Sequence, residues 1–139
     1  MTTEDYVSHG LAKLLKEKGF DEYCRFVYNA GVLRSVASLD CHWNEGYGEL
    51  IEEKQNSDFG KYDNAISAPT LQMARKWLEE EKKLYVNVWA ESKDAENNDF
   101  SIVYRLQVFD GKTNYGTFEF PSREKACEAG IRFCLENLI

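Results

Sequence analysis

The chain has 139 residues, of which 43% are hydrophobic and 14% aromatic, so it carries too much apolar material for an intrinsically disordered protein. Acidic side chains number 24 and basic side chains 17, and the resulting net charge of −7 argues against nucleic acid or an anionic membrane as a partner. A chain of this length fits one domain, and we expect a single α+β domain over residues 1–139.

The N-terminus and the cysteines bear on the cellular compartment. Residues 1–5 are acidic and lack the basic and apolar regions of a secretory signal, and no apolar run is long enough to span a membrane. Cys127 and Cys134 share one expected helix and lie about 10 Å apart along its axis, whereas a disulfide requires Cα atoms within about 7 Å. We therefore expect reduced thiols in a bacterial cytoplasm.

The N-terminal half, residues 1–66, begins with an amphipathic pattern. A helix is predicted over residues 8–18, where three leucines form one stripe and Gly19 is suited to end the helix. Two antiparallel strands are predicted next, over residues 24–29 and 32–39. Residues 40–66 mix aromatic side chains with turn-forming residues, which leaves open whether this stretch is ordered by its aromatics or mobile.

The C-terminal half, residues 67–139, shows a clearer pattern of helix, three strands and helix. The strands alternate apolar and polar residues, and the last helix repeats apolar and small residues at helical spacing. We expect an antiparallel sheet flanked by helices, with dsRBD-like topology as one version of this order. The predicted elements are a helix over 67–83, strands over 85–91, 100–109 and 115–120, and a helix over 123–138.

Alternation along the strands divides the sheet into two faces. We expect the two flanking helices to cover one face, which consists of Val86, Val88, Ile102, Leu106, Val108 and Phe118. The other face carries a second apolar and aromatic group, Tyr85, Trp89, Val103 and Phe109. A face this rich in aromatic rings requires cover, either from the N-terminal half or from a homodimer or protein partner. These four residues form the predicted partner surface.

Three stretches of the chain carry a resemblance to a known group of proteins. They are residues 12–22 (Ala-Lys-Leu-Leu-Lys-Glu-Lys-Gly-Phe-Asp-Glu), 67–78 (Ser-Ala-Pro-Thr-Leu-Gln-Met-Ala-Arg-Lys-Trp-Leu) and 124–139 (Glu-Lys-Ala-Cys-Glu-Ala-Gly-Ile-Arg-Phe-Cys-Leu-Glu-Asn-Leu-Ile). Together they resemble small uncharacterised proteins of phages, prophages and mobile elements of gut anaerobes. That group has no assigned activity, so the resemblance implies a cellular setting and no site residues.

The order helix, three antiparallel strands, helix is also similar to that of double-stranded-RNA-binding domains. In those domains, basic residues at the start of the final helix contact phosphates. Arg123 and Lys125 occupy that place here, and Glu124 and Glu128 interleave with them. Neighbouring carboxylates weaken the attraction for phosphate, so nucleic acid is not the favoured partner. Duplex RNA remains an alternative partner.

Candidate catalytic and metal-ligating residues gather near position 41. Cys24, Cys41 and His42 have metal-ligating side chains, but a structural zinc site needs four ligands and only His9 adds a further histidine. A nucleophile set of Asp40, Cys41 and His42 is a second alternative, as in a small hydrolase. Adjacent strand residues point to opposite faces, however, so His42 does not reach the Cys41 thiol from the same strand.

These observations favour a non-enzymatic protein-interaction or accessory protein. We predict no catalytic residues, no metal, no cofactor and no small-molecule ligand, and no membrane partner. The predicted partner is another protein or a second copy of the chain.

Overall fold

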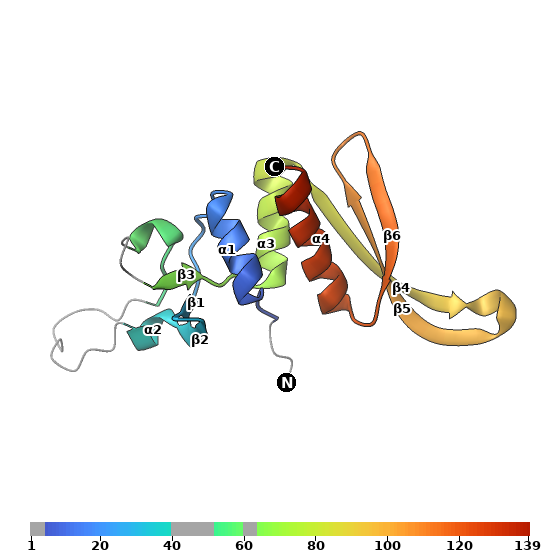
Figure 1. Cartoon of the computed structure of the whole chain (residues 1–139), viewed down its shortest axis with the longest axis horizontal. Coiled ribbons are helices and arrows are strands. Elements are labelled where there is room, and N and C mark those ends of the chain that lie inside the picture. The colour runs from blue at the N-terminus through green and yellow to red at the C-terminus, as the bar shows by residue number, and fades with distance from the viewer. Residues whose placement is uncertain (1–4, 40–51, 60–63) are drawn as a thin grey trace, which may run out of the picture. The chain divides into compact units, whose positions relative to one another are not determined.

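The computed structural model describes residues 5–39, 52–59 and 64–139. Contacts within the chain divide it into two compact units, unit 1 (Met1–Thr70) and unit 2 (Leu71–Ile139). Each unit contains a three-stranded antiparallel sheet together with helices, which confirms the α+β class (Figure 1). Across the described residues, no helix has both the length and the apolar character needed to cross a membrane.

Unit 1 opens with helix α1 (His9–Glu17), as the leucine stripe predicts. The Ser8 side chain caps the helix by accepting a hydrogen bond from the Leu11 N–H at 3.3 Å. Gly19 follows the last turn with a φ of +93°, a left-handed conformation that glycine adopts without steric cost.

The sheet of unit 1 has the order β2-β1-β3, with strands β1 (Phe26–Asn29), β2 (Val32–Ser35) and β3 (Ala65–Ser67). The predicted second strand ran to residue 39, but β2 ends at Ser35 and the short helix α2 (Val36–Leu39) follows. Ser35 explains the difference, because its hydroxyl accepts a hydrogen bond from the Ser38 N–H at 3.2 Å and so caps the helical turn.

A buried asparagine orders part of the region that the sequence leaves undecided. Asn56 begins the short 3₁₀ helix η1 (Asn56–Asp58) and its side chain is buried. The amide group donates to the Phe20 carbonyl at 2.8 Å and accepts from the Ser67 N–H at 2.9 Å. Asn56 therefore ties η1 to the end of α1 and to β3 through satisfied polar contacts.

Unit 2 has the predicted order of helix, three strands and helix. The first helix starts at Leu71 rather than at residue 67, because Ser67 belongs to β3. The elements are α3 (Leu71–Trp77), the π-helical turn η2 (Leu78–Lys82), β4 (Tyr85–Asp94), the 3₁₀ turn η3 (Ala95–Asn97), β5 (Asp99–Phe109), β6 (Asn114–Phe120) and α4 (Arg123–Asn137). The strands form an antiparallel meander in the order β4-β5-β6.

Helix α4 covers one face of this sheet and α3 packs against α4 (Figure 1). Ile131 and Leu135 are fully buried on α4. A Cβ atom added at Gly130 would lie 2.6 Å from Val86 and 2.7 Å from Leu106, so only glycine permits this close approach of helix and sheet. The buried face of the sheet includes Val86, Leu106 and Val108, as predicted.

Two residues predicted on the covered face are exposed, and this part of the prediction is wrong. Ile102 is 57% exposed and Phe118 is 59% exposed. The strands β4 and β5 have 10 and 11 residues, or about 33–36 Å, whereas the 15 residues of α4 span about 22 Å. The β4–β5 hairpin therefore extends past the helix (Figure 1). Ile102 pairs with Ser92 in the part of the hairpin near its turn, and Phe118 lies on β6, the outer strand that α4 covers least.

Candidate binding pocket

A β-bulge in β6 determines which aromatic side chains face α4. Between the paired positions of Phe118 and Tyr115, β6 has two residues where β5 has one. The first of these two is Gly116, whose φ of +46° matches the type of bulge that begins with a left-handed glycine. Regular alternation would place Tyr115 and Phe118 on opposite faces, and the bulge places both on the face toward α4.

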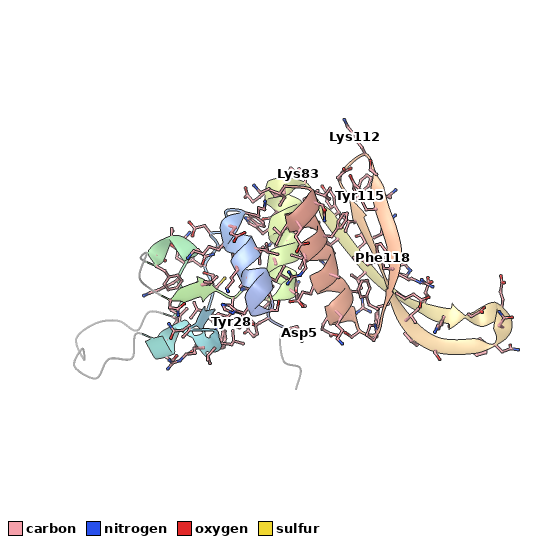
Figure 2. The ribbon with its side chains drawn as sticks, in the orientation of Figure 1. Asp5, Tyr28, Lys83, Lys112, Tyr115 and Phe118 are labelled. Carbon is pink, nitrogen blue, oxygen red and sulfur yellow. The ribbon has the colours of Figure 1, made fainter. Side chains whose placement is uncertain are left out.

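An apolar pocket of about 220 Å³ lies between α4 and the β5–β6 hairpin. Figure 2 shows two of its aromatic residues, Tyr115 and Phe118, along β6 on the side of α4. The lining consists of Leu106, Val108, Tyr115, Phe118, Phe120, Ala129 and Phe133. The phenol group of Tyr115 is the single polar side-chain group in this lining.

The pocket exists because α4 is seated off the centre of the sheet. Close contact at Gly130 holds the helix against Val86 and Leu106, and α4 contacts β4 and β5 more extensively than β6. On the side of α4 that faces β6, the small Ala129 leaves space one turn before Phe133. The Phe133 ring lies 5.4 Å from the Tyr115 ring, which closes one end of the pocket.

Asp110 fixes the Tyr115 end of the pocket by hydrogen bonds. Its carboxylate accepts the backbone N–H groups of Thr113 at 2.7 Å and Lys112 at 2.9 Å, and the Tyr115 hydroxyl at 3.0 Å. The two backbone donors, together with the phenol, lower the pKa of Asp110, and the hydrogen bond to Asp110 raises the pKa of Tyr115. Tyr115 is therefore a neutral, oriented wall residue near neutral pH.

The exposed rim of α4 beside the pocket carries charge. Lys125 precedes Ala129 by four residues and Arg132 follows it by three, so both cations neighbour Ala129 on the helix surface. The Arg132 guanidinium pairs with Glu136 at 3.4 Å, and both groups are partly exposed. Lys125 is exposed, and Glu128 follows it by three residues on the same helix.

The predicted partner surface lies on the opposite face of the sheet. Tyr85 pairs with Phe109, and their ring centroids are 6.2 Å apart. Trp89 pairs with Arg105, and Val103 with Glu91. Tyr85 is 37% exposed, and the other three predicted residues are half-buried.

Ion pairs lie among the aromatic side chains on that face. Arg105 bonds Glu91 at 2.7 Å and Glu119 at 3.1 Å, across all three strands. Glu91 also accepts the indole N–H of Trp89 at 3.0 Å, and these bonds from Trp89 and Arg105 lower the pKa of Glu91. The surface therefore combines aromatic rings with a row of ion pairs, and its role in binding stays a prediction.

The structure separates the two cations considered for RNA contact. Arg123 lies over the sheet, with its guanidinium carbon 5.2 Å from the centre of the Tyr104 ring, a cation–π distance. Lys125 follows two residues later, and helical residues two apart do not share a face. Arg123 and Lys125 are therefore not brought together as one phosphate-binding pair.

The described cysteines are core residues. Cys24, Cys127 and Cys134 are buried and unpaired with each other. Burial raises the pKa of Cys24 and of Cys134 to about 12 and also raises that of Cys127, so all three thiols are protonated near neutral pH. Asp40, Cys41 and His42, the alternative nucleophile set, lie outside the described residues.

His9 and the acidic side chains form no metal site in the part of the chain that the structure describes, where no group of three His, Cys, Asp or Glu side chains is arranged to hold an ion. The His9 ring instead packs 5.1 Å from the Tyr28 ring. The pocket itself was not predicted from the sequence. Gly116 within a predicted strand is the signal that could have indicated it, since an isolated glycine in a strand often marks a bulge.

Comparison of the chain with protein-family models, with curated proteins and with solved structures found no match. The pocket and the two sheet faces are therefore interpreted from their own geometry.

Proposed function

We propose that the chain is a non-enzymatic protein-interaction protein, an accessory protein of a phage or mobile element, and that unit 2 carries the binding surface. The observation that carries this proposal is the apolar pocket between α4 and β6, whose lining residue Phe118 is 59% exposed. A formed apolar cavity next to an exposed aromatic ring is typical of a binding site, because filling it removes apolar surface from water.

The chemistry of the pocket supports binding over catalysis. Its lining offers one phenol, held neutral by Asp110, and lacks a paired acid and base or an activated nucleophile. The raised pKa values of the described thiols make them poor nucleophiles. The phage or mobile-element setting rests on the three sequence stretches alone.

The proposal is tested by chemical cross-linking and affinity capture from a bacterial lysate with the full chain as bait. Wild type is compared with Ala129→Phe, which fills the pocket, and with Trp89→Ala, which alters the opposite face. Ala90→Phe is the matched control, because it adds the same ring at an exposed position of β4, which β5 separates from the pocket strand β6.

We expect Ala129→Phe to lose a partner that wild type and Ala90→Phe both retain, with the circular dichroism spectrum unchanged. Loss of the partner in Trp89→Ala alone would assign the interaction to the predicted partner surface on the other face. A capture profile and a solution mass that are the same for all four proteins would contradict a protein-interaction function.

A further inference from the structure

We propose that the pocket is an anchor site for an extended peptide segment of a partner protein, which inserts one large apolar side chain between α4 and β6 and places a carboxylate near Lys125. This inference rests on the proposed protein-interaction function and specifies the chemistry of the partner. Four observations carry it: the pocket's volume, its lining, the open edge of β6 and the charge on the rim of α4.

The volume of the pocket limits the size of the side chain that can fill it. An apolar cavity of roughly 150 Å³ holds a benzene ring, and pockets for drug-sized ligands start at roughly 300 Å³. The pocket here, at about 220 Å³, lies between these sizes and suits a single Phe or Leu side chain. Buried side chains that fill such pockets dominate the energetics of protein interfaces.

The pocket lies beside a free sheet edge, which favours a partner segment in extended conformation. β6 is at the edge of the β4-β5-β6 sheet, and among the described residues it pairs with β5 on one side only. Backbone N–H and C=O groups on a free edge can pair with an added strand. The bulge at Gly116 interrupts this edge, and the longer of the two regular segments, Phe118–Phe120, supplies two lining residues of the pocket.

The charge on α4 favours a partner with a carboxylate, and the net charge of the chain disfavours a second copy as the partner. Lys125 is exposed beside the pocket with Glu128 as its neighbour on α4, so its attraction for an added carboxylate is modest, whereas Arg132 is already paired with Glu136. A carboxylate next to the anchor residue would complete an ion pair with Lys125. Self-association would instead bring together two chains that each carry a net charge of −7.

The test is a titration of the ¹⁵N-labelled full chain with three probes, followed by heteronuclear NMR. The probes are N-acetyl-L-phenylalanine with its free carboxylate, N-acetyl-L-phenylalaninamide and N-acetyl-L-alaninamide. We expect both phenylalanine probes to shift the amide signals of Phe118, Ala129 and Phe133, and the alanine probe to leave them unchanged. At low salt the carboxylate form should bind about two- to fivefold more tightly than the amide, as for an exposed ion pair.

Variants separate the parts of the inference. Lys125→Gln should remove the advantage of the carboxylate and leave affinity for the amide unchanged. Ala129→Phe should abolish the binding of both phenylalanine probes, and Ala90→Phe should preserve it. Each variant is checked for an unchanged pattern of amide signals elsewhere in the spectrum.

Equal binding of the alanine probe, or binding that survives Ala129→Phe, would overturn the anchor site. A carboxylate advantage that persists in Lys125→Gln would overturn the rim assignment. If the wild type has the solution mass of a dimer and Ala129→Phe has that of a monomer, a second copy of the chain occupies the pocket. This result would also overturn the inference. If the probes fail but a captured protein is lost in Trp89→Ala, the anchor site is wrong and the protein-interaction function stands.

Discussion

At the residue scale, Gly116 connects backbone conformation to the shape of the pocket. Its φ is +46°, and a Cβ atom added there would lie 2.7 Å from the Phe118 ring. The ring therefore occupies the space that a side chain at position 116 would need. One glycine thus permits both the bulge and the position of Phe118.

We expect Gly116→Ala to lower the free energy of unfolding by about 1–3 kcal/mol, the range for a strained backbone residue, and to move the Phe118 ring. Urea denaturation and the aromatic NMR signals of Phe118 measure the two effects. Gly111→Ala is the control, since Gly111 has a φ of +97° and no atom within 4 Å of an added Cβ. It should lower stability through strain while leaving the Phe118 signals unchanged, and a Phe118 ring unmoved in Gly116→Ala would contradict this account.

Asp110 gives a prediction on pH. Its pKa is lowered in the folded chain, so its contribution to stability is present above the pKa of the unfolded chain and is lost as pH falls through the folded pKa. Asp110→Asn should therefore be less stable than wild type at pH 7, and the difference should shrink when both proteins are unfolded in urea at about pH 3. A difference that is constant or larger at acid pH would contradict the hydrogen-bonded role of the Asp110 carboxylate.

At the element scale, the unequal lengths of strand and helix divide one sheet face into a core and an exposed extension. Leu106→Ala, under α4, should cost about 2–5 kcal/mol because it opens a cavity in the core. Ile102→Ala lies on the same strand and face, but past α4, and should cost at most about 1 kcal/mol. Chemical denaturation of the two variants measures both values, and equal losses would mean that the hairpin extension is covered.

Periodicity predicted the elements of unit 2 and left the irregular positions undetermined. The alternation of Val86, Leu106 and Val108 correctly identified the buried face, and the stripe of α4 correctly identified Ile131. Alternation assumes a regular strand, so it could not place Tyr115 beside Phe118 across a bulge. Alternation also does not show how much of a sheet face a helix covers. For this reason Ile102 and Phe118 were predicted on the covered face, although both are exposed.

At the scale of the whole molecule, the sequence predicts one domain with a less certain N-terminal half, residues 1–66, and a clearer block over residues 67–139. The structure divides into two compact units at Thr70 and Leu71, close to that boundary. The candidate site could not be predicted at this scale, because the pocket depends on three separate details. These are the close approach at Gly130, the bulge at Gly116 and the small side chain at Ala129.

We propose that the chain binds its partner through the apolar space between α4 and β6. Intermolecular nuclear Overhauser effects between N-acetyl-L-phenylalanine and the full chain test it most directly, because they report which side chains lie within a few ångströms of the bound ring. We predict contacts from the ring to the methyl group of Ala129 and to the rings of Phe118 and Phe133. Contacts to Tyr85 and Trp89 instead would place the binding site on the opposite face and contradict the account.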